Sequence, residues 1–396
     1  MNIKSLLLGS AAALIAVSGA RAADAVTVAE PEPAEYVKIC DVYGAGYFYI
    51  PGTETCLRIG GYLRYDIGAG DLGSFDGARG GDVKTGKDQG TWYKHARFSL
   101  KTWTGQETEL GTLKTYTETR FNFQNHNADY APFVNAPGGS VSLNFAWIQL
   151  GGLRVGKDES AFDTFIGYAG NVIQDTLIPY GGFDTNVVQY YFDAGNGFSA
   201  VVSLEEGSGA GTIKDGTHYG HYYGAGAIDS YVPHVVGGVK WTQGWGAITG
   251  VVAYDSNYES VSGKVRLDVN VNDALSLFIM GGFGSKNHLE DTSYFDYAGG
   301  RGFYKPWGGS WAVWGGGTYK FSEKASLNAQ ISADQWKNLG VAANVAYTVV
   351  PGLTVTAEVD YLHAGRFGDA GPENFAWTGA TKKNSVGGML RFQRDF

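Results

Sequence analysis

The sequence predicts an all-β fold, a sixteen-stranded antiparallel transmembrane β-barrel with its third long loop folded inward. Three observations carry this prediction. Apolar and polar residues alternate with a period of two. Successive connections between the predicted strands are short and long in turn, and glycine and aromatic residues are abundant. Alternation gives each strand a lipid-facing and a lumen-facing side, and short turns on one rim with long loops on the other are typical of outer-membrane barrels.

The composition narrows the class of protein further. The chain has 60 glycines and 14% aromatic residues, an unusual mixture for a soluble helical enzyme. Beyond the first residues no apolar run reaches the roughly 18 residues that a membrane helix needs, and the mean hydropathy is −0.16. The formal net charge of −9 argues against nucleic acid as a partner.

The first segment, residues 1–22, has the features of a secretory signal peptide. Lys4 precedes an apolar core from Leu6 to Val17, and Ala20-Arg21-Ala22 is a small-x-small cleavage site. Cleavage there would remove two positive charges, Lys4 and Arg21, so that the net charge would change from −9 to −11. We therefore expect an exported chain whose barrel domain comprises residues 23–396.

The segment 23–56 precedes the alternating pattern. Residues 23–36 are rich in proline and glutamate and are predicted to form a flexible lead. In an exported chain Cys40 and Cys56 are expected to form a disulfide that holds an aromatic hairpin turning at Pro51-Gly52. A C-x-x-C redox site or a zinc site would need another spacing. The position of this hairpin relative to the barrel is left open.

The alternating pattern begins at Leu57, where Leu57, Ile59 and Leu63 alternate with Arg58 and Arg64. An even number of strands closes such a sheet without an edge, which a bilayer requires because unpaired backbone groups are costly in hydrocarbon. The predicted strands cover residues 57–67, 91–104, 110–125, 140–150, 152–157, 185–194, 197–206, 232–243, 245–256, 259–272, 274–284, 309–321, 325–335, 337–350, 352–363 and 385–396. Tight turns are expected at pairs such as Gly105-Gln106 and Pro351-Gly352.

The long insertion at residues 158–184 is the candidate functional element. A loop of about 25 residues is seldom kept without a role. It carries acidic residues, and the strand phases place basic residues on the lumen side. We expect a water-filled channel in which a basic wall faces an acidic loop across a constriction, and such an arrangement needs no cofactor or metal. The predicted basic wall is Arg58, Arg64, Arg97, Lys101, Arg120 and Arg154, and the predicted acidic loop residues are Asp158, Glu159, Asp163, Asp175 and Asp184.

Several segments resemble a known family along nearly the whole chain. The segments CDVYGAGYFYIPGTETCLRIGGYLRYD, ETELGTLKTYTETRFNF and FAWIQLGGLRVGKDES, with the ending LRFQRDF, are similar to the general porins of Rhizobiales-type alphaproteobacteria. The resemblance implies a homotrimeric diffusion channel for small hydrophilic solutes and ions in the Gram-negative outer membrane, in contact with lipopolysaccharide. Phe396, with Phe392 and Leu390 in phase, is similar to the signal read by the outer-membrane assembly machinery, although Arg394 occupies an in-phase position that is usually apolar.

The alternative to a general diffusion channel is a substrate-selective channel of the same fold, for example for oligosaccharides. An inward series of aromatic residues would favour that alternative, and the polar phases show none. Trp311, Trp314 and Tyr347 are assigned to aromatic girdles and subunit contacts. An enzyme is not expected, because no strand offers a coherent set of Ser, His and Asp or Asn. His218 and His221 lack the partners of a metal site.

Overall fold

The computed structural model describes residues 38–73, 75, 77–125, 138–208, 226–285, 302–367 and 382–396. The chain divides into two units, Met1–Ile39 and Cys40–Phe396, and the fold described here is that of the second unit. The expected signal peptide and the lead segment 23–36 lie outside the described residues, as do His218 and His221.

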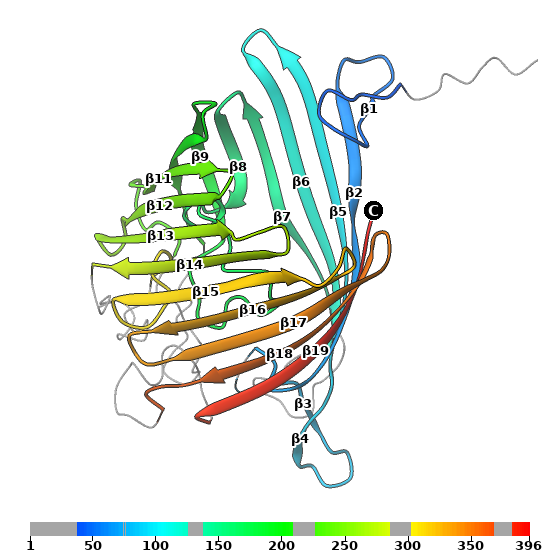
Figure 1. The fold of residues 1–396 in the computed structure, drawn as a ribbon, viewed down its shortest axis with the longest axis vertical. Coiled ribbons are helices and arrows are strands. Elements are labelled where there is room, and N and C mark those ends of the chain that lie inside the picture. Colours follow the sequence, from blue (N-terminus) through cyan, green and yellow to red (C-terminus); the bar gives the residue numbers. More distant parts are fainter. Residues whose placement is uncertain are drawn as a thin grey trace, which may run out of the picture. The chain divides into compact units, whose positions relative to one another are not determined.

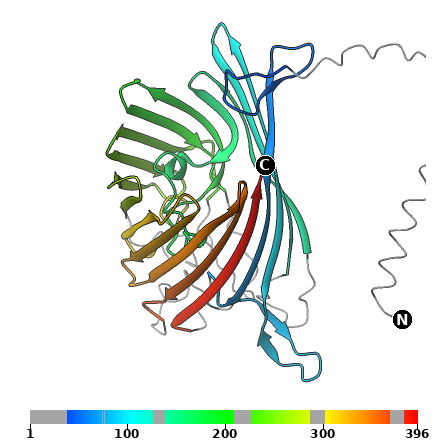
Figure 2. The ribbon, with the colours of Figure 1, turned by 45° about the vertical axis from the view of Figure 1, so that its right-hand side comes forward.

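Sixteen antiparallel strands form a closed barrel within the described part of the chain, as the alternation predicted (Figures 1 and 2). The last strand pairs with the first, from Gly387 opposite Gly70 to Asp395 opposite Tyr62. Closure leaves no barrel edge with unpaired backbone groups. The barrel strands are β2 (Cys56–Gly70), β5 (Tyr93–Thr108), β6 (Gly111–Gln124), β7 (Gly138–Leu150), β8 (Leu153–Glu159), β9 (Asp184–Asp193), β10 (Phe198–Glu205), β11 (His234–Gln243), β12 (Gly246–Asp255), β13 (Ser260–Asn270), β14 (Leu275–Gly284), β15 (Trp311–Lys320), β16 (Ala325–Asp334), β17 (Leu339–Val350), β18 (Leu353–His363) and β19 (Asn384–Asp395).

Each strand presents one apolar phase to the outside and a second phase to the lumen. On β13, Val265 is 62% exposed whereas the preceding Lys264 is 1% exposed. The same alternation places Ile331 outside on β16 and Gln330 inside. Exposed apolar side chains on one phase are what lipid contact favours, so the other phase is the lumen phase of the barrel.

One end of the barrel has short turns alone, and the other end has the long connections together with two short ones, at residues 256–259 and 335–338. The turn between β5 and β6 is at Glu109-Leu110, so the prediction of a turn at Gly105-Gln106 was wrong. Gly105 lies within β5 because its missing side chain makes room for another ring: a Cβ there would stand 2.7 Å from the ring of Tyr43. Glycine in this strand therefore marks close packing and not a chain reversal.

The hairpin of residues 40–56 lies against the short-turn end of the barrel. The Cys40–Cys56 disulfide is present, as predicted, and β1 (Phe48–Tyr49) pairs with β2. The Tyr43 hydroxyl donates to Glu107 at 2.9 Å, which holds the hairpin on β5. Figure 1 shows β1 at the end opposite the small hairpin of β3 (Arg79–Gly81) and β4 (Asp88–Gly90).

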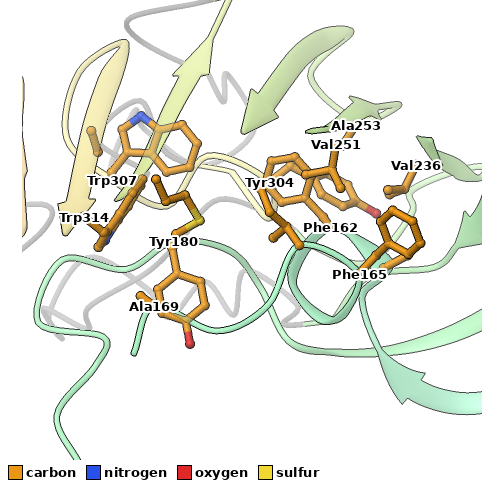
Figure 3. Close-up of a cluster of buried hydrophobic side chains, with 14 of the residues drawn as sticks. Phe162, Phe165, Ala169, Tyr180, Val236, Val251, Ala253, Tyr304, Trp307 and Trp314 are labelled. Atoms are coloured by element: carbon orange, nitrogen blue, oxygen red, sulfur yellow. The ribbon is translucent and has the colours of Figure 1, made fainter. Parts of the chain in front are cut away.

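The main apolar core lies between the insertion that follows β8 and the lumen phase of the strands opposite. Phe162, Phe165 and Tyr180 of the insertion pack with Val236, Val251 and Trp314 of β11, β12 and β15 (Figure 3). Tyr304 and Trp307, from the segment before β15, belong to the same cluster. Trp314 is 1% exposed, so its predicted place in an outer aromatic girdle was wrong, whereas Trp311 and Tyr347 are exposed.

Candidate functional site

The predicted basic residues all occupy the lumen phase, but they form separate groups. The first group surrounds Asp66 on β2. Arg64 of β2 and Arg97 of β5 are register partners, and Arg391 of β19 is the partner of Asp66 across the barrel closure. Arg391 donates to both Asp66 oxygens, at 2.7 and 3.0 Å, while the Arg64 Nε lies 3.4 Å from the same carboxylate.

This arginine group lines a cavity of about 300 Å³ together with the insertion. Arg64, Arg97 and Arg391 lie on its wall, and Ile173 and Gln174 of the insertion lie on it as well. Leu72, Gly77 and Ala78, from the connection after β2, and Tyr93, His95, Gln124 and Met389 complete the lining with Asp66. The structure therefore brings part of the predicted basic wall next to the predicted loop.

The second group surrounds Glu118 of β6, which is 2% exposed. Arg120 donates to its carboxylate at 2.7 Å, and the Lys101 ammonium lies 3.7 Å away. The hydroxyls of Ser99 and Tyr116 also donate to it, each at 2.9 Å. One carboxylate thus orients two predicted cations and fixes their positions on the wall.

Arg154 and Arg58 have other partners. Arg154 on β8 forms an ion pair with Asp158 at 2.7 Å, so one predicted cation is neutralised by one predicted acid of its own strand. Arg58 stacks on the ring of Trp103 at the short-turn end, with its guanidinium carbon 4.7 Å from the ring centroid. Neither residue lines the cavity shared with the insertion.

The insertion begins at a capped single turn, α2 (Ala161–Thr164). Ser160 is its N-cap, because the Ser160 side chain accepts from the Phe162 amide at 3.1 Å. The Ser160 hydroxyl and the Ala161 amide both donate to Glu205 of β10, at 2.6 and 2.9 Å, and the Tyr304 hydroxyl donates to the same carboxylate. A buried carboxylate on the neighbouring wall thus fixes the start of the insertion.

A fully buried ion pair anchors the insertion to β13. The Lys264 ammonium lies 2.5 Å from Asp163, donates to the Tyr180 carbonyl at 2.8 Å, and lies over the Phe162 ring at 4.1 Å. Burial raises the pKa of Asp163 against the opposing effect of Lys264. Asp163 is 0% exposed, so it does not face a water-filled passage, and its predicted place in the acidic filter was wrong.

Further anchors reach strands around the opposite wall. The amides of Ile173 and Gln174 donate to Glu358 of β18 at 2.5 and 2.7 Å. Gln330 of β16 donates to the Asp175 carbonyl, and Trp314 of β15 donates to the Ile178 carbonyl, each at 2.8 Å. These bonds engage the backbone of the insertion, so side chains of the strands satisfy its buried amides and carbonyls in addition to the contacts that its own side chains make.

The other loop acids have local roles. Asp175 accepts from the Tyr180 hydroxyl at 2.7 Å, and burial raises the pKa of Asp175 to about 6. Glu159 accepts from the hydroxyl of Tyr168, whose pKa is raised by burial and then by that carboxylate. Asp184 forms an ion pair with Lys157 and has a 55% exposed side chain.

A band of aromatic side chains lies on the lumen phase in the short-turn half of the barrel. Trp103 and Tyr116 stack with centroids 5.3 Å apart, and Trp147 lies 5.7 Å from Tyr116. The Arg154 guanidinium lies over Trp147 at 4.0 Å and over Tyr191 at 4.9 Å. The interpretation that the polar phases carry no aromatic series was therefore wrong, because the rings alternate with Arg and Lys on the same phase.

Sequence reasoning missed four residues that organise the site: Arg391, Lys264, Glu205 and Glu358. Arg391 could have been found, since it lies between the outward residues Leu390 and Phe392 and so falls on the lumen phase of the last strand. The other three also fall on lumen phases, but their partners belong to an irregular segment whose course no periodicity predicts.

None of the helices among the described residues is long and apolar enough to cross a membrane. Within the same residues, no three or more His, Cys, Asp or Glu side chains gather where they could hold a metal ion.

Comparisons with known proteins agree on one family. Residues 24–389 match the family described as Porin subfamily. The chain is 50% identical over 399 residues to Porin Omp2b of Brucella canis and 49% identical to Porin Omp2b of Brucella abortus (strain 2308), with the whole of each chain covered.

Two solved structures share the fold at low sequence identity. The outer membrane channel DcaP of Acinetobacter baumannii is 16% identical with a TM-score of 0.55, and the match covers 88% of this chain and 99% of DcaP. OprB of Pseudomonas putida is 12% identical with a TM-score of 0.52, and the match covers 85% of this chain and 94% of OprB.

Proposed function

This chain belongs to the porin subfamily and is an outer-membrane diffusion channel, and we propose that its narrowest passage runs between residues 160–183 and the wall of β19, β2, β5 and β6. The third long loop would then fold into the lumen and set the size limit for small hydrophilic solutes and ions. The observation that carries this proposal is the cavity lined both by Arg64, Arg97 and Arg391 and by Ile173 and Gln174.

The anchors of the insertion support this placement. They reach β10, β13, β15, β16 and β18, none of which belongs to the wall formed by β19, β2, β5 and β6. The apolar cluster fills the space between the insertion and that wall. This arrangement leaves water and solutes the side lined by β19, β2, β5 and β6, where the cavity with its arginine group lies.

Charges across this passage are of both signs. The wall provides Arg64, Arg97, Lys101 and Arg120 of the predicted set, and Arg391 joins them. On the insertion side, Glu159 and Asp175 remain candidates after Asp163 is excluded. Separated charges of this kind give a transverse field, which orients dipolar solutes and disfavours apolar ones.

Single-channel conductance in a planar bilayer tests the position of the passage. Replacing Gln174 by Trp adds a ring beside the arginine group, so we expect Gln174→Trp to lower the conductance by about half or more for a constriction of a few ångströms. The matched control is Gln243→Trp, because Gln243 lies on the outward phase at the end of β11. Unchanged conductance in Gln174→Trp would overturn the placement.

The remaining expectations are part of the same proposal. We propose a homotrimer in contact with lipopolysaccharide, inserted by the outer-membrane assembly machinery after removal of residues 1–22. The exposed apolar phase and the 50% identical porins support it. Closure of single insertions in three equal steps would be the corresponding signature in the bilayer recording.

A substrate-selective sugar channel is the second candidate, and the aromatic band favours it. Planar rings provide stacking surfaces for sugars, but here one ring face of Trp147 is covered by Arg154 and Trp103 stacks on Tyr116. Saturable block of the ion current by maltohexaose, removed by Trp147→Ala, would favour this candidate. The family and the fold point to a channel and not to an enzyme.

A further inference from the structure

We propose that the cavity lined by Arg64, Arg97 and Arg391 is a binding subsite for dianionic oxyanions, with phosphate and phosphomonoesters as the solute class. This inference rests on the proposed passage, since the cavity lies beside Gln174 of the insertion. It adds a preference for one class of solute at one named point of the wall.

The charge balance of the cavity carries the argument. Its described lining contains three guanidinium groups and one carboxylate, that of Asp66. Arg391 makes a two-point contact with Asp66, and Arg64 approaches the same group at the longer distance of 3.4 Å. Arg97 donates through Nε to a neutral acceptor, Asn122, at 2.7 Å. Two positive charges are therefore left without a compensating carboxylate in the described lining.

Because these side chains are largely buried, their excess positive charge is only weakly screened by water. The side chains of Arg64 and Arg391 are only 14% and 18% exposed, so water screens their mutual repulsion less than it would on an open surface. The Arg64 Nε is buried and, apart from its ion pair with Asp66, has no hydrogen-bond partner among the described residues. An anion bound between the guanidinium groups would supply both the missing charge and the missing acceptor.

The chemistry of the ligand follows from the donors. Guanidinium groups present N–H donors in a planar fork that matches phosphate and carboxylate oxygens. A phosphomonoester carries a charge of about −1.5 to −2 near neutral pH, which balances two excess guanidinium charges. Tyr93, His95 and Gln124 add neutral polar groups to the lining, and a cavity of about 300 Å³ has room for a small organic phosphate.

The groups around Glu118 and Arg154 carry less excess charge within the described residues. Lys101 and Arg120 share Glu118, which leaves one net positive charge, and Arg154 is neutralised by Asp158. The preference for a dianion is therefore expected at the Arg64, Arg97 and Arg391 group and not along the whole wall, even though the complete chain is acidic.

Chloride current through single channels, recorded while inorganic phosphate is added, tests the subsite. We expect saturable reduction of the current by phosphate, and we expect acetate to need an about tenfold higher concentration because it carries one charge. Arg97→Gln removes one excess charge but leaves Asp66 paired, so it should raise the half-blocking phosphate concentration about tenfold. Arg64→Gln should act in the same direction. Arg79→Gln is the matched control, since Arg79 lies on β3 outside the barrel strands and pairs with Asp88.

The outcomes separate this inference from the proposed passage. If Gln174→Trp lowers the conductance but phosphate acts no more strongly than acetate, or blocks both arginine variants as it blocks the unsubstituted protein, the subsite is overturned and the passage stands. Line broadening of the phosphate signal in phosphorus NMR, caused by the folded protein in detergent, measures binding at the subsite independently of channel activity. Broadening that Arg97→Gln leaves unchanged would overturn the subsite even if no channel activity were recorded.

Discussion

At the scale of single residues, Asp175 of the insertion makes the stability of the protein depend on pH. Burial raises its pKa from 3.8 to about 6, so the folded state binds more protons than the unfolded state between these values. Its contribution to stability is complete below pH 3.8 and is lost as the pH rises through about 6. At 1.36 kcal/mol per pKa unit this amounts to at most about 3 kcal/mol.

We therefore expect Asp175→Asn to flatten the pH dependence of the unfolding free energy between about pH 4 and 7 and to stabilise the protein at neutral pH. Chemical denaturation in detergent, followed by circular dichroism at several pH values, measures this. Asp82 offers a contrast, because the amides of Thr85 and Lys84 lower its pKa. The stability that this lowered pKa provides is present above pH 3.8 and is lost only at lower pH, so Asp82→Asn should leave the slope between pH 4 and 7 unchanged. Equal slopes in the unsubstituted protein and Asp175→Asn would contradict the argument.

The lumen phase of most site residues was predictable, whereas their partners were not. Arg64, Arg97, Lys101 and Arg120 follow from a local period of two. In the sequence, nothing near Asp163 distinguishes it from the other acidic residues of the insertion. Its burial depends on a contact with Lys264, which lies about 100 positions later in the sequence. Such a distant contact leaves no trace in a local pattern.

At the scale of elements, the insertion depends on the buried pair of Asp163 and Lys264. Removing one partner of a buried pair leaves an uncompensated charge, which typically costs about 3–5 kcal/mol. We expect Lys264→Met to destabilise the protein by an amount toward the lower end of that range, since Asp163 can become protonated. The double variant Asp163→Asn with Lys264→Met should recover most of the loss. Urea denaturation of the unsubstituted protein, Asp163→Asn, Lys264→Met and the double variant gives the coupling energy between the two side chains.

The exposed pair of Lys157 and Asp184 is the control for this cycle. The side chain of Asp184 is 55% exposed, and exposed ion pairs contribute about 0–1 kcal/mol. Lys157→Met should therefore have a small effect. If Lys264→Met were as mild as Lys157→Met, the buried pair would not anchor the insertion, and the remaining hydrogen bonds and the apolar cluster would have to hold it.

At the scale of the whole molecule, the barrel was predictable and the arrangement within it was not. The sixteen strands and their closure follow from the alternation of apolar and polar residues and from the order of short and long connections. Both are local features that repeat along the chain. The side of the lumen that the insertion covers depends on Glu205, Lys264, Trp314 and Glu358, which come from four different strands. Only the closed sheet brings them to one surface.

Barrel closure also gives Phe396 two separate roles. Its amide donates to the Gly61 carbonyl at 3.1 Å and its carbonyl accepts from the Gly61 amide at 3.0 Å, so the last residue joins the last strand to the first. Its ring stacks on Phe98 with centroids 6.3 Å apart and remains 57% exposed. The backbone bonds serve closure, and the exposed ring is the part that an assembly machinery could recognise.

These roles separate when the ring alone is removed. Phe396→Ala keeps both backbone bonds, so we expect nearly normal refolding in detergent, measured by heat-modifiable gel mobility, but a several-fold lower amount of assembled protein in cells. Deleting Phe396 should impair both. Phe321 is the matched control, since its ring is also 57% exposed and lies beside the turn after β15. If Phe321→Ala reduced assembly in cells as much as Phe396→Ala did, the effect would come from lost apolar surface, and the terminal ring would not be the assembly signal.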